Sequence, residues 1–160
     1  METDPSPSSP AAESAAFADF YREHFGEVAR LAYLLTSSRE AAQDLAQDAF
    51  VGLHRRWRSV DEPRPYVRRA VTNACRSYHR RRILERRNGQ GPAPDGTLGE
   101  PDELFDALAR LKYRQRAAIV LRYYHDLPDD EIGAALGCRP ATVRSLIFRG
   151  LAELRKVIEP

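Results

Sequence analysis

The stretch PDDEIGAALGCRPATVRSLIFR, residues 128–149, decides the fold of the carboxy-terminal part of the chain. Its first half places apolar Ile132 and Leu136 one helical turn apart, which favours a short amphipathic helix. Gly137 can take the left-handed conformation that ends a helix, and Pro140 suits the first turn of the next one. The segment therefore predicts a helix-turn-helix.

The second helix of this motif is predicted to have one buried face and one exposed face. In an α-helix, successive residues are rotated by 100° about the helix axis. Ile147, Leu151 and Leu154 therefore lie on the same side as Val143 and form the inner stripe. A helical hairpin used only for packing would leave an exposed Phe148 beside two arginines without a purpose. A recognition helix instead offers its early exposed residues to base edges and phosphates. We therefore expect DNA contacts at Thr142, Arg144, Ser145, Phe148 and Arg149.

The whole chain is predicted to be all-α, with two small helical domains joined by a flexible linker. Apolar residues recur at helical spacing, and no stretch shows the sustained alternation of a half-buried strand. The linker at 88–101, NGQGPAPDGTLGEP, has four glycines and three prolines. Residues 1–15 contain no large apolar side chain, so we expect a disordered tail. This leaves a first domain at 16–87 and a second, four-helix domain with the helix-turn-helix at 102–160.

Positive charge is concentrated in one segment. The chain has 25 basic and 23 acidic residues, but the segment 64–87 holds nine arginines and one glutamate. A dense arginine block in a nearly neutral chain indicates local contact with a polyanion, although a solvated helix face is the simpler alternative. At helical spacing, Arg69, Asn73, Arg76 and Arg80 share one face, which suits a nucleic-acid backbone.

An acidic face is expected on the preceding helix. Asp44, Gln47 and Asp48 are spaced i, i+3 and i+4, which indicates either a docking patch or a solvated surface. A nuclease that holds a metal with Asp44, Asp48 and His54 is a rival interpretation, but one short helix supplies no second set of ligands. Cys75 and Cys138 stand alone, so we expect no metal, cofactor or disulfide.

Three motifs in this order are similar to one family. They are DLAQDAF at 44–50, YVRRAVTNACRSYHRRR at 66–82 and PDDEIGAALGCRPATVRSLIFRGLAELR at 128–155. Together they resemble the extracytoplasmic-function sigma factors, the smallest bacterial sigma subunits, and look closest to the arginine-rich actinobacterial kind. The resemblance covers about residues 16–158.

This resemblance implies a transcription initiation factor and not an enzyme. It places docking on the RNA polymerase core, the beta and beta-prime subunits, at Asp44, Gln47, Asp48 and Phe50. It implies that residues 58–82 melt the minus-ten element and hold its single strand, and that the helix-turn-helix reads duplex DNA at the minus-thirty-five element. Many family members are held inactive by an anti-sigma factor between the two domains, and a flexible linker permits such a partner here.

Two further expectations concern the location of the chain in the cell and a rival DNA-binding function. The chain has no signal-peptide pattern and no run of about 18 apolar residues, so we expect it in the cytoplasm without membrane insertion. A conventional regulator with a ligand-sensing first half is the rival binding module. Such a regulator would bind duplex DNA tightly by itself, whereas a sigma factor needs the polymerase core.

Overall fold

The computed structural model describes residues 9–89 and 103–159. The first group of helices is α1 (Pro10–Thr36), α2 (Arg39–Arg55), the 3-10 turn η1 (Trp57–Ser59) and α3 (Pro63–Arg87). The second group is α4 (Glu103–Arg110), α5 (Tyr113–Tyr123), α6 (Asp129–Leu136) and α7 (Pro140–Ile158). No strand occurs in these residues, which confirms the all-α prediction. No helix among them is long and apolar enough to cross a membrane. The predicted linker lies outside the described residues, except for positions 88 and 89.

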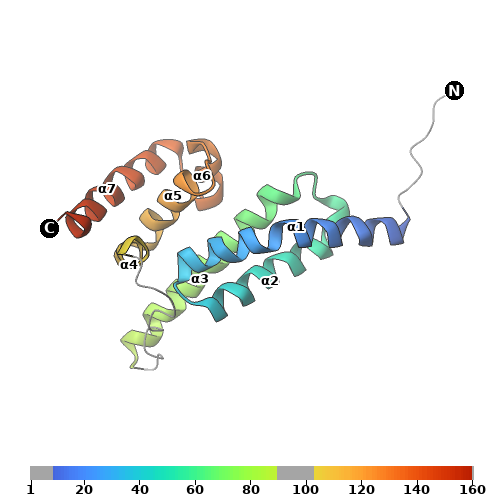
Figure 1. Cartoon of the computed structure of the whole chain (residues 1–160), viewed down its shortest axis with the longest axis horizontal. Coiled ribbons are helices and arrows are strands. Elements are labelled where there is room, and N and C mark those ends of the chain that lie inside the picture. Colours follow the sequence, from blue (N-terminus) through green and yellow to red (C-terminus); the bar gives the residue numbers. More distant parts are fainter. Residues whose placement is uncertain (1–8, 90–102, 160) are drawn as a thin grey trace.

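Helices α1, α2 and α3 form a three-helix bundle (Figure 1). Each contributes one apolar stripe, and Leu31, Leu53 and Val67 are completely buried where the stripes meet. Burying such side chains contributes about 1.5–3 kcal/mol each. Phe50 belongs to this core, because it is only 1% exposed and its ring centroid lies 5.1 Å from that of Tyr21.

The burial of Phe50 corrects one expectation about the docking site. We predicted that Phe50 contacts the polymerase core together with its acidic neighbours. The structure turns this ring into the bundle, where Phe20, Tyr21 and Phe25 surround it. Phe50 therefore holds α2 against α1, and only the polar residues of the motif face outward.

The start of α1 corrects a second expectation. Residues 10–15 were predicted to belong to a disordered tail, but the helix begins at Pro10. Proline suits a first helical turn and alanine is the best helix former, so these residues extend the helix toward its amino end. Glu13 accepts a hydrogen bond from Arg58 Nε at 2.5 Å, which joins this first part of α1 to η1.

The predicted helix-turn-helix is confirmed. Helix α6 ends at Gly137 with φ 67°, and the Cys138 amide donates to the Gly133 carbonyl oxygen at 2.9 Å. Helix α7 then begins at Pro140. The turn leaves no room at Gly133, because an added Cβ would lie 2.6 Å from the Cys138 carbonyl oxygen.

The two helical groups pack against each other in this structure. Arg116 of α5 is 4% exposed and donates from Nη1 to the Leu35 carbonyl oxygen of α1 at 2.9 Å. The Tyr113 hydroxyl donates to the Thr72 carbonyl oxygen of α3 at 2.7 Å. These contacts join residues far apart in sequence, so sequence periodicity gave no sign of them.

Candidate nucleic-acid interface

The predicted basic face of α3 is exposed along most of its length. The helix starts at Pro63, and residues 69, 73, 76 and 80 follow at intervals of three and four, so their side chains project from one side. Arg69, Asn73 and Arg80 are exposed and Arg76 is half-buried. Within residues 9–89 and 103–159, no carboxylate lies within 4.0 Å of these arginines. Their charges are therefore available to phosphates.

Other arginines of the same helix have acidic partners. Arg64 Nη2 lies 3.0 Å from Glu27 Oε1 of α1. Arg68 Nη1 lies 3.8 Å from Glu131 Oε2 of α6, and the Arg68 side chain is only 12% exposed. Arg82 pairs with Glu85 at 3.8 Å on α3 itself. The sequence pattern did not separate Arg64 and Arg68 from the unpaired arginines, because their partners on α1 and α6 are distant in sequence.

Helix α7 presents the expected arc to solvent. Phe148 is 76% exposed, as predicted, and Arg144, Ser145 and Arg149 are exposed beside it. Thr142 is half-buried near the start of the helix. An exposed aromatic ring beside two exposed arginines is a combination that suits contact with a thymine methyl group, guanine and phosphates.

One side chain of this arc is held by an acidic partner. Arg144 Nη1 donates to Asp129 Oδ2 at 3.2 Å, and Asp129 also pairs with Arg122 of α5. Asp129 thus links α5, α6 and α7 at the turn of the motif. Arg149 has no such partner among the described residues.

The acidic face of α2 lies beside a groove. Asp44, Gln47 and Asp48 are exposed, as their spacing predicted. A groove of about 500 Å³ between α2 and α3 is lined by Asp44, Asp48, Tyr78 and Arg81, among others.

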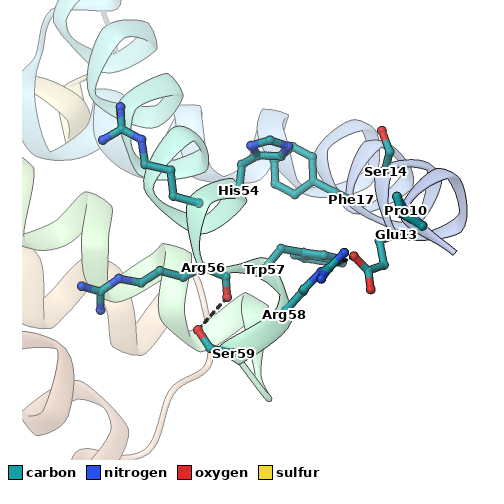
Figure 2. Close-up of a pocket in the computed structure, with 10 residues that line it drawn as sticks. Pro10, Glu13, Ser14, Phe17, His54, Arg56, Trp57, Arg58 and Ser59 are labelled. Atoms are coloured by element: carbon teal, nitrogen blue, oxygen red, sulfur yellow. Dashed lines mark hydrogen bonds and ion pairs between the residues drawn. The ribbon is translucent and has the colours of Figure 1, made fainter. Parts of the chain in front are cut away.

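A second hollow lies between the first turns of α1 and the end of α2. Figure 2 shows Phe17, His54 and Trp57 lining it, with Glu13 and Arg58 at one side. The Trp57 and Phe17 rings meet edge to face at 5.4 Å. Its volume is about 430 Å³. The Trp57 ring, at the start of η1, thus packs against Phe17 and Phe20 of α1.

His54 and Cys75, two residues with side chains capable of chemistry, are both packed against other parts of the first helical group. His54 packs its ring edge against Phe17 at 4.7 Å, in the hollow between α1 and α2. In the part of the chain that the structure describes, no three His, Cys, Asp or Glu residues are placed to hold a metal ion. Burial raises the pKa of the Cys75 thiol to about 12, so this thiol stays protonated and inert at neutral pH.

Both halves of the chain match families of known proteins. The family described as Sigma-70 region 2 matches residues 20–83, and the family described as Sigma-70, region 4 matches residues 102–154. The first match contains α2 and the basic face of α3. The second contains the helix-turn-helix.

Similar proteins extend over nearly the whole chain. The RNA polymerase sigma-E factor of Streptomyces coelicolor is 32% identical over 153 residues, which are 90% of this chain and 86% of that protein. The ECF RNA polymerase sigma factor SigE of Mycolicibacterium smegmatis is 35% identical, over 86% of this chain and 59% of the relative.

Solved structures share the fold. The sigma factor RpoE in complex with the anti-sigma factor NepR, from Bartonella quintana, superposes with a TM-score of 0.72 at 24% identity, covering 88% of this chain and 97% of that one. CnrH, in complex with the cytosolic domain of CnrY, gives a TM-score of 0.66 at 23% identity, covering 91% of this chain and 89% of that one.

Proposed function

The chain belongs to the extracytoplasmic-function sigma factors of the sigma-70 family, and we propose how its two halves divide the recognition of a promoter. It binds RNA polymerase and directs transcription initiation from promoters. The division proposed here assigns core docking and the minus-ten element to residues 16–87, and the minus-thirty-five element to residues 102–160. Residues 88–101 connect the two.

The minus-ten element is assigned to α3. Arg69, Arg76 and Arg80 project from one side of the helix and have no acidic partner among the described residues, so they can follow the phosphates of a separated strand. Asn73 lies among them and carries both a donor and an acceptor, which suits the edge of an unpaired base.

The minus-thirty-five element is assigned to the exposed arc of α7. The arc contains Thr142, Arg144, Ser145, Phe148 and Arg149. Arg144 stands near the amino end of the recognition helix, where side chains reach base edges in the major groove. Its pair with Asp129 fixes the direction of the guanidinium before DNA arrives.

Docking on the polymerase core is assigned to Asp44, Gln47 and Asp48. These side chains are exposed and line up along α2 beside the groove between α2 and α3. Complementary charge on the polymerase would accelerate encounter and fix the orientation of the complex.

Three further assignments follow from the family. We place the chain in the cytoplasm, where polymerase acts, and we assign it no catalytic reaction of its own. We also propose regulation by an anti-sigma factor, because the sigma factor RpoE, which shares its fold, was solved in complex with the anti-sigma factor NepR.

One observation carries this function. The same chain contains a basic face on α3 whose arginines have no acidic partner among the described residues, and a helix-turn-helix formed by α6 and α7. The test is run-off transcription from genomic fragments with purified polymerase core, with and without the chain. We expect promoter-specific transcripts only when the chain is present.

Charge reversal at Asp44 and Asp48 should weaken core binding while the circular dichroism spectrum stays unchanged. Equal transcription by the wild-type and the charge-reversed chain would refute the docking assignment.

A further inference from the structure

A pocket lies where the two halves of the chain meet. It has a volume of about 460 Å³, which is within the range of small-molecule sites. Its walls come from both halves: the end of α1 and the last part of α3 on one side, and the α4 to α5 connection on the other. None of its lining residues is among the side chains assigned to DNA or to polymerase, and it adjoins the groove beside the acidic face of α2, with which it shares Ser38, Tyr78 and Arg82.

The lining of this pocket is strongly basic. Arg82, Arg86, Lys112 and Arg116 contribute to it, and no Asp or Glu of the described residues belongs to the lining. Among residues 9–89 and 103–159, Arg82 is the one of these four side chains with an acidic partner, Glu85 at 3.8 Å. Arginine and lysine in such a group favour a phosphate-bearing ligand, because each guanidinium can donate two parallel hydrogen bonds.

Arg116 adds a buried donor without a partner. Its two terminal nitrogens donate to the carbonyl oxygens of Leu35, Ala109 and Leu111. Its Nε has no hydrogen-bond partner among the described residues, although the residue is only 4% exposed. A buried donor without a partner destabilises the protein, so Arg116, which lines the pocket, can gain by turning this donor toward a ligand oxygen.

The surrounding backbone and rings fit the same ligand class. Helix α5 starts at the pocket, and the side chain of its N-cap Lys112 makes no capping hydrogen bond, so first-turn amides remain available to an anion. The Leu35 carbonyl oxygen, which would repel an anion, already contacts His79 and Arg116. Tyr78, Ile83 and Tyr113 supply an apolar wall for a nucleobase.

The positive potential also acts on His79. Burial lowers the pKa of His79, its hydrogen bond to Leu35 opposes this, and the charges of Arg116 and Arg86 lower it further. His79 therefore stays neutral near neutral pH, and the positive charge comes from the lysine and the arginines.

We propose that this interdomain pocket binds a small anion with at least two phosphate groups, of the nucleoside diphosphate class, and that the bound anion holds the two halves together.

The consequence for transcription rests on the proposed function. Positions minus thirty-five and minus ten are about 25 base pairs apart, or about 85 Å at 3.4 Å per base pair. Helices α3 and α6 touch here through Arg68 and Glu131, so a chain held closed does not reach both elements. Binding of the anion thus reduces promoter engagement.

Binding is measured on the full chain without polymerase or DNA, so its outcome is independent of the proposed function. Isothermal titration calorimetry with ADP, and separately with pyrophosphate, should show one site. The double variant Arg86→Ala/Lys112→Ala should weaken binding at least tenfold. The matched control is Arg87→Ala/Arg110→Ala, which removes one exposed arginine from each half but leaves the lining intact, and should change binding less than twofold. Absence of binding at millimolar ADP and pyrophosphate, or an equal loss in both double variants, would overturn the site.

Bridging is measured by hydrogen exchange of the full chain with saturating ADP. Exchange should slow in both halves, at residues 36–38 and 78–86 and also at residues 109–116, because the ligand contacts both. The control variant should behave as the wild type, and Arg86→Ala/Lys112→Ala should not respond. Slowing confined to one half would show that the ligand does not bridge the domains.

Discussion

Helices α3 and α7 both carry a proposed DNA face, but their arginines are held in different ways. On α3, the exposed Arg69 and Arg80 have no acidic partner in the described part of the chain, while Arg64 and Arg68 pair with carboxylates on other helices. On α7, the exposed Arg144 near the start of the helix is paired with Asp129, while Arg149 further along has no acidic partner among the described residues. An unpaired arginine keeps the freedom to follow a flexible single strand, whereas a paired one approaches a rigid duplex in a fixed direction.

The same contrast distinguishes two groups of arginines within α3: those that stabilise the packing of the helix and those that are free to contact nucleic acid. Surface ion pairs contribute little individually, but in the pair with Glu131 the Arg68 side chain is only 12% exposed, and this pair joins the two halves. The nine arginines of segment 64–87 therefore do not form one uniform surface. Some hold α3 in place, and others remain for the nucleic acid.

The largest expected effect comes from a substitution that disrupts the helix-turn-helix and so displaces α7. Gly133→Ala places a Cβ 2.6 Å from a backbone oxygen of the turn, so α6 and α7 must separate. We expect a loss of about 3 kcal/mol in the free energy of unfolding, measured by urea titration with circular dichroism, and loss of minus-thirty-five binding.

Gly26→Ala is the matched control for that substitution. Gly26 lies within α1, and an added Cβ would have nothing within 4 Å. We expect stabilisation by about 0.5–1 kcal/mol, because alanine favours the helix. Equal destabilisation by both substitutions would contradict the importance of the tight turn.

An intermediate effect distinguishes the two arginines of α7. Arg144→Ala should cost roughly 1–3 kcal/mol in DNA binding and relax the preference at one or two base pairs. Arg149→Ala should weaken binding about equally on all sequences and reduce the salt slope by roughly one. Both variants are measured on a randomised minus-thirty-five library at two salt concentrations. If Arg144→Ala keeps the wild-type preference and Arg149→Ala changes it, the docking geometry assigned to α7 is wrong.

The smallest expected effect is a pH dependence at the contact between the halves. Burial lowers the pKa of His125, the charge of nearby Glu27 opposes this, and the charges of Arg68 and Arg64 lower the pKa further. Its Nδ1 lies 3.2 Å from Glu27 Oε1. The folded chain thus favours neutral His125, so unfolded molecules bind more protons below pH 6.5 and stability falls as the pH drops.

The measurement for this effect is thermal unfolding between pH 7.5 and 5.5. The wild-type chain should lose stability as the pH falls through 6.5, and His125→Gln should flatten part of that loss. His79 has a pKa lowered in the same direction, so some of the dependence remains in this variant. An identical pH profile for the wild type and His125→Gln would contradict the role of His125.

Local signals in the sequence were sufficient for some elements and not for others. Gly137 and Pro140 determine a turn through their own backbone preferences, so the helix-turn-helix was predictable. The exposure of Phe148 followed from helical phase. The resemblance grouped Phe50 with its exposed neighbours, although burial against α1 determines its position.

Contacts between distant segments could not be predicted in the same way. Composition placed residues 10–15 in the tail, although alanine and a first-turn proline favour the helix that forms there. The burial of Arg116 could not be predicted, because its acceptors are backbone carbonyls on α1 and around α4. Which arginines of α3 are paired depended on Glu27 and Glu131, which lie on other helices.

The most direct test compares two triple variants of the same helix in open-complex formation with polymerase. The first replaces the unpaired Arg69, Arg76 and Arg80 by alanine, and the second replaces the paired Arg64, Arg68 and Arg82. Both are measured on a duplex promoter and on a template mismatched across the minus-ten region. Thermal unfolding of each variant is followed in parallel.

We expect the unpaired triple to form open complexes at least tenfold more slowly on the duplex, to recover most of the loss on the mismatched template, and to keep its melting temperature. The paired triple should lower the melting temperature and retain more open-complex formation below it. If the unpaired triple fails equally on both templates, or if the two triples behave alike, the division of the α3 arginines into structural and DNA-contacting groups is contradicted.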